Sequence, residues 1–576
     1  MNTLVIVLIA AVVLVCAYAG YGRWLAKTWG VDPNAKTPAV RLEDGKDYVP
    51  TNGWTVFAHQ FSSIAGAGPV TGAIQAAAFG WLPVLLWVLI GGVFFGAVTD
   101  FGALYASVKN DGKSMGLLIE KYIGKTGRKL FLLFCWLFCG IVIAAFADMV
   151  AGTFNAFDAE GAPVEAAFTN GAAGMVSIMF MVFAVVFGFI QKKFNFSGWR
   201  EAVIGIVFIV LSFAVGMNCP LVFGKAAWSY ITFVYIFFAA VLPMWMLKQP
   251  RDYMTTFMFG AMIAGAVIGL LVAHPTMNLP VFTGFNNAKL GTMFPILFVT
   301  VACGAVSGFH SLVSSGTSSK TVENEKDMLK VGYGAMVLES LLAVLALCVA
   351  GAAAAADGTP ATGTPFQIFS RGVAGFFEMF GVPASIATVF MTMCVSALAL
   401  TSLDAVARIG RMSFQELFSV DDMEHAEGWR KLCCNVYFST FITLVFGFIL
   451  TQIGYANIWP LFGSANQLLS ALVLATLCVF LKVTGRNNKM LFPPLVIMLC
   501  VTFTALVQRL IAMVKAISAA ASTAIPAGET TWGAVFIANG LQLILAVLLI
   551  VLGLNIVFHS VKSYTTCDAP EAKATV

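Results

Sequence analysis

Long apolar stretches separated by short polar segments run along almost the whole chain. A helix that crosses the hydrocarbon core of a bilayer needs about 20 mostly apolar residues. Fifteen stretches approach that length, at 3–20, 54–79, 82–108, 130–155, 173–190, 201–217, 228–247, 253–273, 292–318, 335–355, 384–406, 434–453, 461–481, 490–514 and 533–557. The pattern predicts an all-α polytopic membrane protein with about fifteen transmembrane helices. We expect 1–20 to form an extra N-terminal helix and the polar residues 558–576 to form a disordered tail.

The composition excludes several classes of protein. Of the 576 residues, 59% are hydrophobic and only 11% are charged, against about 25% charged residues in soluble domains. A soluble enzyme, a nucleic-acid-binding protein and a disordered scaffold are therefore ruled out. The twelve cysteines lie mostly in apolar runs and lack the spacing of a zinc site or a disulfide framework. We expect no metal and no cofactor.

The basic residues predict the orientation of the chain in the membrane. Lys and Arg accumulate in cytoplasmic loops. If the N-terminus lies outside, 28 of the 33 basic residues fall in loops on the inside. The loops on the outside then hold four, and one lies within a helix; these five are Lys225, Lys289, Arg371, Lys515 and Arg509. The prediction is an N-out, C-in topology.

Two of the predicted spans contain residues that interrupt helices. The span 54–79 includes the sequence GAGP at 66–69, and proline removes a helical N–H donor. The span 292–318 leads into 304–319, which holds six serines, a threonine, a histidine and three glycines. Free backbone groups cannot face lipid, so both segments must be enclosed by protein or line a watery cavity. We expect each to be a discontinuous helix.

The spacing of these two segments suggests an internal repeat. They are the second and ninth predicted spans, and an odd offset gives them opposite directions across the membrane. We therefore expect two inverted repeats, at 54–273 and 292–557, each opening with a discontinuous helix. Paired broken helices at matching positions of two halves indicate the substrate site of a transporter.

The broken segments supply the candidate substrate-binding residues. Half-helix N-termini near Gly66 and Gly316 would seat an anion, because their N–H groups and helix dipole favour negative charge. The full candidate set is His59, Ser62, Ser63, Gly66, Gly68, Ser307, His310, Ser311, Ser314, Ser315 and Gly316. The alternative is that the serines and glycines only allow close helix packing, and that the histidines are bonded to neighbouring backbone.

Four acidic residues lie inside predicted spans and are candidates for proton coupling: Asp100, Asp148, Asp404 and Glu339. Asp148 is the favoured one, because no basic residue lies near it in sequence. Asp404 precedes Arg408 by four residues, so an ion pair along one helix is the alternative there. Asp100 and Glu339 could instead be helix ends that face water.

The sequence also contains one further polar stretch inside an apolar run, and it lacks a nucleotide-binding motif. In the segment 459–467, the amides of Asn466 and Gln467 could bind either a substrate or a neighbouring helix, and both interpretations stay open. The sequence GKS at 112–114 lacks the glycine that a phosphate-binding loop requires, and the loops are too short for a nucleotide-binding domain. Energy must come from an ion gradient or from the substrate's own gradient.

Several motifs resemble those of the carbon starvation protein A (CstA) family. They are DYVPTN at 47–52, IAGAGP at 64–69, GAVTDF at 96–101, CGAVSGFH at 303–310, SLD at 402–404 followed by Arg408, and the stretch 459–467. The resemblance covers nearly the whole chain, although longer members of the family have additions that are absent here. It implies a multi-pass protein of the bacterial inner membrane, related to the amino acid–polyamine–organocation superfamily. It also implies pyruvate uptake by proton symport, or peptide uptake, during nutrient limitation.

The sequence therefore predicts a secondary active transporter that imports a small carboxylate, with pyruvate and proton symport as the first hypothesis. Short-peptide uptake is the alternative, and a membrane nutrient receptor without flux is a third reading. The expected partners are the carboxylate substrate, the proton and the lipid bilayer, and no nucleic acid. An enzyme is not expected. Substrate would sit between the broken helices, with His310 and the serines binding its carboxylate and Asp148 or His59 taking the proton.

Overall fold

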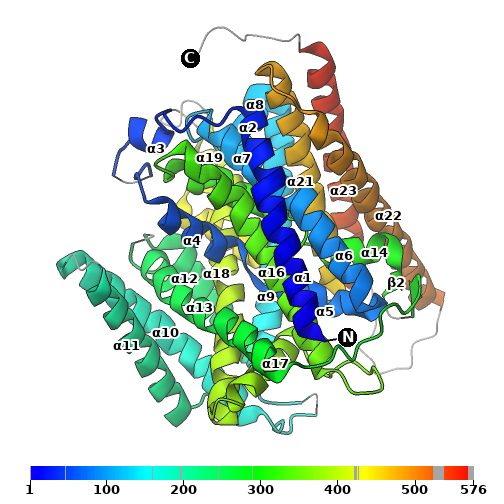
Figure 1. The fold of residues 1–576 in the computed structure, drawn as a ribbon. Coiled ribbons are helices and arrows are strands. Elements are labelled where there is room, and N and C mark those ends of the chain that lie inside the picture. Colours follow the sequence, from blue (N-terminus) through cyan, green and yellow to red (C-terminus); the bar gives the residue numbers. More distant parts are fainter. Residues whose placement is uncertain are drawn as a thin grey trace.

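The protein is a bundle of helices (Figure 1). The computed structural model describes residues 2–567 apart from 46, 159, 195–197, 244, 289, 421–424, 426 and 523–537. The helix that begins the chain starts at one end of the bundle, and the helix that finishes it stops at the opposite end (Figure 1).

Within the described ranges, eleven helices are long and apolar enough to cross a membrane. Four of these spans are continuous runs of shorter segments: α1 (Thr3–Ala17), η1 (Tyr18–Gly22) and α2 (Arg23–Trp29); α6 (Trp81–Gly91), η3 (Gly92–Gly96) and α7 (Ala97–Val108); η5 (Glu325–Asp327), η6 (Leu329–Gly334) and α16 (Ala335–Ala353); and η7 (Lys489–Leu491) with α22 (Phe492–Ser522). The other seven are single helices: α9 (Lys125–Thr153), α10 (Ala167–Phe194), α11 (Trp199–Asn218), α13 (Lys248–Ala273), α18 (Ala384–Phe418), α21 (Tyr455–Val483) and α23 (Ala538–Thr566). A twelfth span results if α19 (Gly428–Cys434) and α20 (Val436–Thr451), which meet at a 70° bend, are counted together.

Three predicted spans do not pass this test of length, and each has a physical reason. The helix α12 (Lys225–Val241) has 17 residues, fewer than a typical span. The other two are interrupted, as α4 (Gly53–Ile64) with α5 (Ala67–Ala76), and as α14 (Met293–Thr300) with α15 (Gly308–Gly316). The structure thus supports a multi-pass helical membrane protein, whereas the count of fifteen crossings stays a prediction.

The remaining elements are short. They are α3 (Pro38–Arg41), η2 (Ala77–Phe79), α8 (Met115–Ile123), the antiparallel pair β1 (Asn286–Asn287) and β2 (Gly291–Thr292), η4 (Ser318–Lys320), and α17 (Pro365–Glu378). Helix α17 was not predicted from the sequence, although a capping box between Thr364 and Gln367 and a proline at its first position mark its start.

Burial divides the bundle into a centre and a periphery. Helices α9 and α18 pack along each other, and the most apolar window of α21 is fully buried among its neighbours. The α10–α11 pair lies at one edge (Figure 1), and α11 exposes most of its surface. Because that surface is apolar, it is the kind of surface that faces lipid.

The end of the chain differs from the prediction. Helix α23 continues to Thr566, so the first part of the tail predicted to be disordered is helical. The rest of that tail, 568–576, lies outside the described residues.

Candidate functional site

The first break lies at the start of the GAGP sequence (66–69), as predicted. Helix α4 ends at Ile64, Ala65 and Gly66 have non-helical backbone angles, and α5 begins at Ala67. A Cβ on Gly66 would lie 2.2 Å from Ser402 Oγ of α18, so a side chain does not fit there. In the described part of the chain, no side chain caps the N-terminus of α5. Its first N–H groups are therefore available to another partner.

The second break lies earlier than predicted. Helix α14 ends at Thr300, the chain is non-helical at 301–307, and α15 runs from Gly308 to Gly316. The N-terminus expected near Gly316 is wrong, because this glycine is the last residue of α15. The half-helix N-terminus is at Gly308, where a Cβ would lie 2.4 Å from the backbone nitrogen of Ser470 in α21. Close packing against α21, which the sequence could not show, sets the position of this break.

The two breaks meet in the interior of the bundle. A Cβ on Gly68 would lie 2.3 Å from Cys303 Sγ, so the start of α5 rests directly on the second break. Beside this contact is a cavity of about 10 Å³, lined by Gly66, Gly68, Cys303, Ser402 and Asn466 together with apolar side chains. This volume suffices for about one water molecule. The breaks thus enclose a small polar-edged site that is closed in this structure.

Side chains of α21 and α6 satisfy the backbone groups that the second break frees. The Phe298 carbonyl accepts hydrogen bonds from Gln467 Nε2 at 2.7 Å and from Trp87 Nε1 at 3.2 Å. Trp459 Nε1 donates to the Thr300 carbonyl at 3.3 Å. These bonds supply the partners that a helix C-terminus lacks.

Asn466 caps the other side of the same break. Its Oδ1 accepts from the Phe309 N–H at 3.1 Å, and its Nδ2 donates to Ser307 Oγ at 3.0 Å. The sequence left open whether Asn466 and Gln467 bind a substrate or a neighbouring helix. In the structure, both amides contact the neighbouring broken helix.

A fully buried cluster of ionisable groups lies beside the second break. His310 Nδ1 is 3.0 Å from Asp100 Oδ2, and His310 Nε2 is 3.3 Å from Glu339 Oε2. All three side chains have 0% exposure. Among the described atoms, Asp100 Oδ1 and both carboxylate oxygens of Glu339 have no hydrogen-bond partner. Asp100 and Glu339 are therefore not helix ends that face water, which was the alternative drawn from the sequence.

The elements that carry the two acids of this cluster share a feature. Asp100 follows the π-helical turn η3, and Glu339 follows the π-helical turn η6, each within five residues of the end of that turn. Single π-helical turns inside α-helices are frequent at functional sites. The turn η6 also packs closely on α7, because a Cβ on Gly332 would lie 2.8 Å from Phe101 Cα.

Most of the predicted serines are engaged in the protein. Gln60 of α4 joins the two broken helices, since its Nε2 donates to Ser314 Oγ at 2.8 Å and its Oε1 accepts from Ser318 Oγ at 2.6 Å. Ser315 donates to the Ser311 carbonyl of its own helix, and the buried Ser311 Oγ is unpartnered within the described residues.

The remaining candidates of the first segment lie in different environments. Ser62 is buried and donates to the His59 carbonyl at 3.2 Å, and Ser63 is buried beside it. His59 itself is exposed. Of the eleven candidate substrate-binding residues, Gly66 and Gly68 line the cavity where the breaks meet, and a role in substrate binding stays a prediction for all eleven.

Asp148 has a partner that the sequence analysis did not foresee. Lys225, the first residue of α12, places its Nζ 2.7 Å from Asp148 Oδ1, and the Tyr455 N–H donates to Asp148 Oδ2 at 2.9 Å. Asp148 therefore does have a base nearby, contrary to the reason for favouring it, because Lys225 is distant along the chain but close in space.

Asp404 is paired with an arginine other than Arg408. It forms an ion pair with Arg251 of α13 and accepts a hydrogen bond from the Tyr235 hydroxyl at 2.8 Å. Arg251 also pairs with Asp252 at 2.7 Å. Arg408 instead donates to backbone carbonyls near the end of α12. The alternative drawn from the sequence, an ion pair of Asp404 with Arg408 along α18, is therefore wrong.

Sequence reasoning missed Gln60, Ser402, Lys225 and Arg251. Gln60 and Ser402 sit within motifs quoted above or next to them, so a closer search of those motifs could have found them. Nothing in the sequence links Lys225 or Arg251 to its carboxylate. Among the described residues, no group of three or more His, Cys, Asp or Glu is placed to hold a metal ion.

Comparison with known proteins assigns the chain to a family. The carbon starvation protein CstA family matches residues 2–362 and 352–505. The peptide transporter CstA of Escherichia coli (strain K12) is 32% identical over 588 residues, which cover 88% of this chain and 80% of that protein. The peptide transporter CstA of Bacillus subtilis (strain 168) is 31% identical, with coverage of 85% and 87%.

A third relative has a different substrate in its name. The pyruvate/proton symporter BtsT of Escherichia coli (strain K12) is 36% identical over 364 residues, which cover 61% of this chain and 49% of that protein. Among solved structures, a manganese transporter of Eremococcus coleocola in complex with an aromatic bis-isothiourea substituted compound has a TM-score of 0.48 and 10% identity, and covers 91% of this chain and 99% of its own. That likeness is too remote to bear on mechanism. Since the relatives are transporters rather than enzymes and the family match spans most of the sequence, the chain is a transporter that belongs to the carbon starvation protein CstA family.

Proposed function

We propose that the protein imports a small carboxylate, pyruvate first, together with a proton across the bacterial inner membrane. The observation that carries the proposal is the fully buried cluster of Asp100, His310 and Glu339 beside the meeting point of two broken helices. Intramembrane acids and histidines are characteristic of proton relays in transporters.

The charge of the cluster explains why it would bind and release a proton. With both carboxylates ionised and the imidazole protonated, Asp100, His310 and Glu339 would carry a net charge of −1 in a site without exposed atoms. Burying an uncompensated charge costs several kcal/mol. One additional proton removes that charge, and contact with water restores the ionised form. A cluster of this kind changes its proton occupancy when the site opens from one side of the membrane to the other.

The substrate carboxylate has a natural seat at the start of α5. The N–H groups of Ala67 and Gly68 belong to an uncapped first turn that borders the cavity, and Pro69 contributes no N–H. A helix N-terminus favours anions through these groups and through its dipole. The start of α15 is less suitable, because Asn466 already accepts from the Phe309 N–H.

The proposal includes the N-out, C-in topology and the two inverted repeats. The ends of the bundle at which the chain starts and finishes are opposite (Figure 1), as an odd number of crossings requires. Asp100 and Glu339 lie in the third and tenth predicted spans, seven apart like the broken helices, and each follows a π-helical turn. Substrate would reach the cavity from each side in turn by rocking of one group of helices against the other.

Uptake by the purified protein in proteoliposomes tests the proposal. For one proton per pyruvate, an imposed gradient of one pH unit supports about tenfold accumulation, since tenfold corresponds to about 1.4 kcal/mol. We expect Glu339→Gln and Asp100→Asn to abolish gradient-driven accumulation and to retain pyruvate exchange. Asp148→Asn is the matched control, because its carboxylate is also intramembrane but is paired with Lys225. Accumulation that does not respond to the pH gradient, or binding without flux, would refute proton symport.

Short-peptide uptake is the second candidate. Two relatives named as peptide transporters align over more of this chain than the relative named as a pyruvate symporter. A peptide also carries a carboxylate for the start of α5. Competition separates the two: a dipeptide that blocks labelled pyruvate uptake, and is itself accumulated, would favour the peptide reading.

A further inference from the structure

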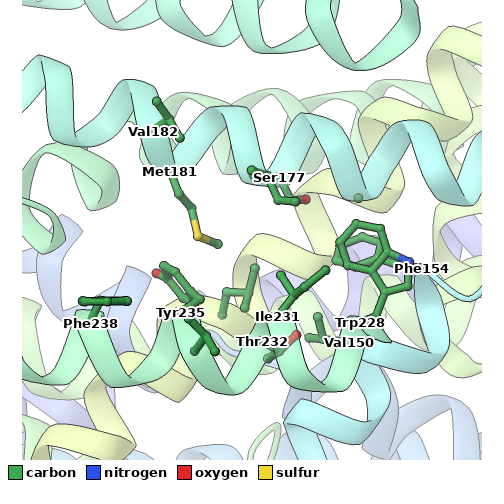
Figure 2. A pocket seen from close by; sticks show the side chains of 14 residues that line it. Val150, Phe154, Ser177, Met181, Val182, Trp228, Ile231, Thr232, Tyr235 and Phe238 are labelled. Atoms are coloured by element: carbon green, nitrogen blue, oxygen red, sulfur yellow. The ribbon is translucent and has the colours of Figure 1, made fainter. Parts of the chain in front are cut away.

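A large apolar cavity lies away from the helix breaks, between α10 and α12. Its volume is about 460 Å³. Met181 of α10 points into the space between the two helices, toward Tyr235 and Ile231 of α12 (Figure 2). Val150 of α9 and Leu400 of α18 complete the wall on the side of the bundle.

The cavity opens onto the lateral surface of the bundle. Three of its lining side chains are also exposed: Val182 at 47%, Val234 at 58% and Phe238 at 53%. Helix α10 packs on α11, α13 and α18, and α12 packs on α9, α18 and α20, so the two helices pack on largely different neighbours rather than closely on each other. The mouth between them is apolar, and it lies between α10, which is long and apolar enough to span a membrane, and the shorter apolar helix α12. It is therefore in contact with hydrocarbon.

One end of the cavity is closed by aromatic side chains. Trp228 stacks its indole over Gly174 of α10, where a Cβ would lie 2.4 Å from the ring, and Phe154 lies beside it with a ring distance of 5.1 Å. The Ser177 hydroxyl at the wall is already bonded to the Ala173 carbonyl at 2.8 Å. The space therefore offers little to a charged substrate or to water, because an apolar cavity of this kind stays dry.

We propose that this cavity is a binding site for one acyl chain of a membrane lipid. The bilayer supplies acyl chains at the mouth at high concentration, and an unfilled void of this size would deprive its walls of dispersion contacts. An acyl chain matches the elongated apolar space between Trp228 and Phe238, which are separated by ten residues along α12 and hence by about 15 Å.

The site has a direct connection to a buried polar network. Tyr235 lines the cavity, and its hydroxyl donates to Asp404 at 2.8 Å and accepts from Arg251 at 2.5 Å. A chain packed on this ring braces α12 against α13 and α18. The acyl chain is thus a structural ligand that stabilises the contacts of α12 with α13 and α18.

Photolabelling by lipid tests the proposal. The full-length protein is reconstituted in phosphatidylcholine–phosphatidylglycerol vesicles that contain a phospholipid with a diazirine in its acyl chain, irradiated, and mapped by mass spectrometry. We expect severalfold more label on Met181, Ile231 and Val234 than on Val496 and Ile497 of α22. Val496 and Ile497 are exposed like Val234, and more than the half-buried Met181 and Ile231, but they do not line this cavity. Equal labelling of the two regions would overturn the proposal.

A variant that fills the cavity can be compared with a variant of the same kind on an exposed helix face. Ile231→Trp occupies the space and should lower labelling of α10 severalfold, whereas Val210→Trp on the exposed face of α11 should not. Unchanged labelling in Ile231→Trp would overturn the acyl site. Cross-linking of two copies of the chain at these residues would also overturn it, because the mouth would then be a protein interface.

A second measurement does not depend on the filling variant. In vesicles of phospholipid with brominated acyl chains, bromine quenches nearby tryptophan emission. We expect the wild type to lose more emission than Trp228→Phe, because Trp228 borders the site although its side chain is buried. Equal losses would mean that no chain reaches Trp228.

Discussion

The break between α4 and α5 depends on a glycine that lies against Ser402, and this contact can be tested quantitatively. Gly66→Ala places a Cβ 2.2 Å from Ser402 Oγ and 3.2 Å from Ser402 Cβ. The first distance is far inside van der Waals contact, and such overpacking costs roughly 1–3 kcal/mol. The second is tight but can be relieved by a small shift.

The double-mutant cycle separates these two contributions. Ser402→Ala alone removes a hydroxyl that donates to the Leu398 carbonyl of its own helix, which should cost less than about 1 kcal/mol. The double variant Gly66→Ala/Ser402→Ala lacks the severe clash, so we expect it to recover most of the loss. The expected coupling is about 1–3 kcal/mol, equivalent to roughly 5- to 150-fold in the population of the competent state.

The measurements are the melting temperature in detergent and the initial uptake rate in proteoliposomes. Gly66→Ala should give the lowest values, with the other two variants close to wild type. Gly152→Ala in α9 is the control, since a Cβ there meets no atom within 4 Å. A double variant as impaired as Gly66→Ala, or a Gly66→Ala variant that behaves like wild type, would refute the packing argument.

Three further changes test the surroundings of the site. Lys225→Met leaves the buried Asp148 carboxylate without its cation and should lower the melting temperature. The loss of unfolding free energy should be less than the roughly 3–5 kcal/mol of a fully buried pair, because the Lys225 side chain is 48% exposed. Adding Asp148→Asn should restore part of the lost stability, and no recovery would count against the pair. Asn466→Ala removes the cap of α15 and should cost about 1–2 kcal/mol in thermal stability with a larger loss of uptake, whereas Asn555→Ala, whose amide bonds only its own helix, should change neither. Trp459→Phe keeps most of the ring packing and loses the bond to the Thr300 carbonyl, so its cost should stay near 1 kcal/mol; a much larger loss would mean that the indole does more than satisfy this carbonyl.

Local sequence determined the class of the protein and the existence of its helices. Each of the fifteen predicted stretches contains helix in the structure, because apolar runs of this length have few other ways to satisfy their backbone in a membrane. The break at Gly66 was also readable, since glycine and proline weaken a helix wherever it lies. The motifs that indicated the family were likewise linear in the chain.

The contacts of the buried acids and the position of the second break depend on residues that are distant in sequence. Asp100 and His310 are 210 residues apart, and Asp148 and Tyr455 are 307 apart, so neither contact has a local signature. The second break was misplaced at Gly316 for the same reason, because α21 supplies the cap and the close contact that fix the start of α15 at Gly308.

What the sequence by itself determined is the set of segments that cannot remain in water, and the points along them where a helix is easily interrupted. The tertiary structure alone decided which buried charges are paired and which atoms remain without a partner. The physical reason is that hydrophobicity and backbone preference belong to single residues and short windows, whereas an ion pair or a helix cap requires two groups at hydrogen-bond distance. Only the packing of helices from both halves of the chain brings such groups together.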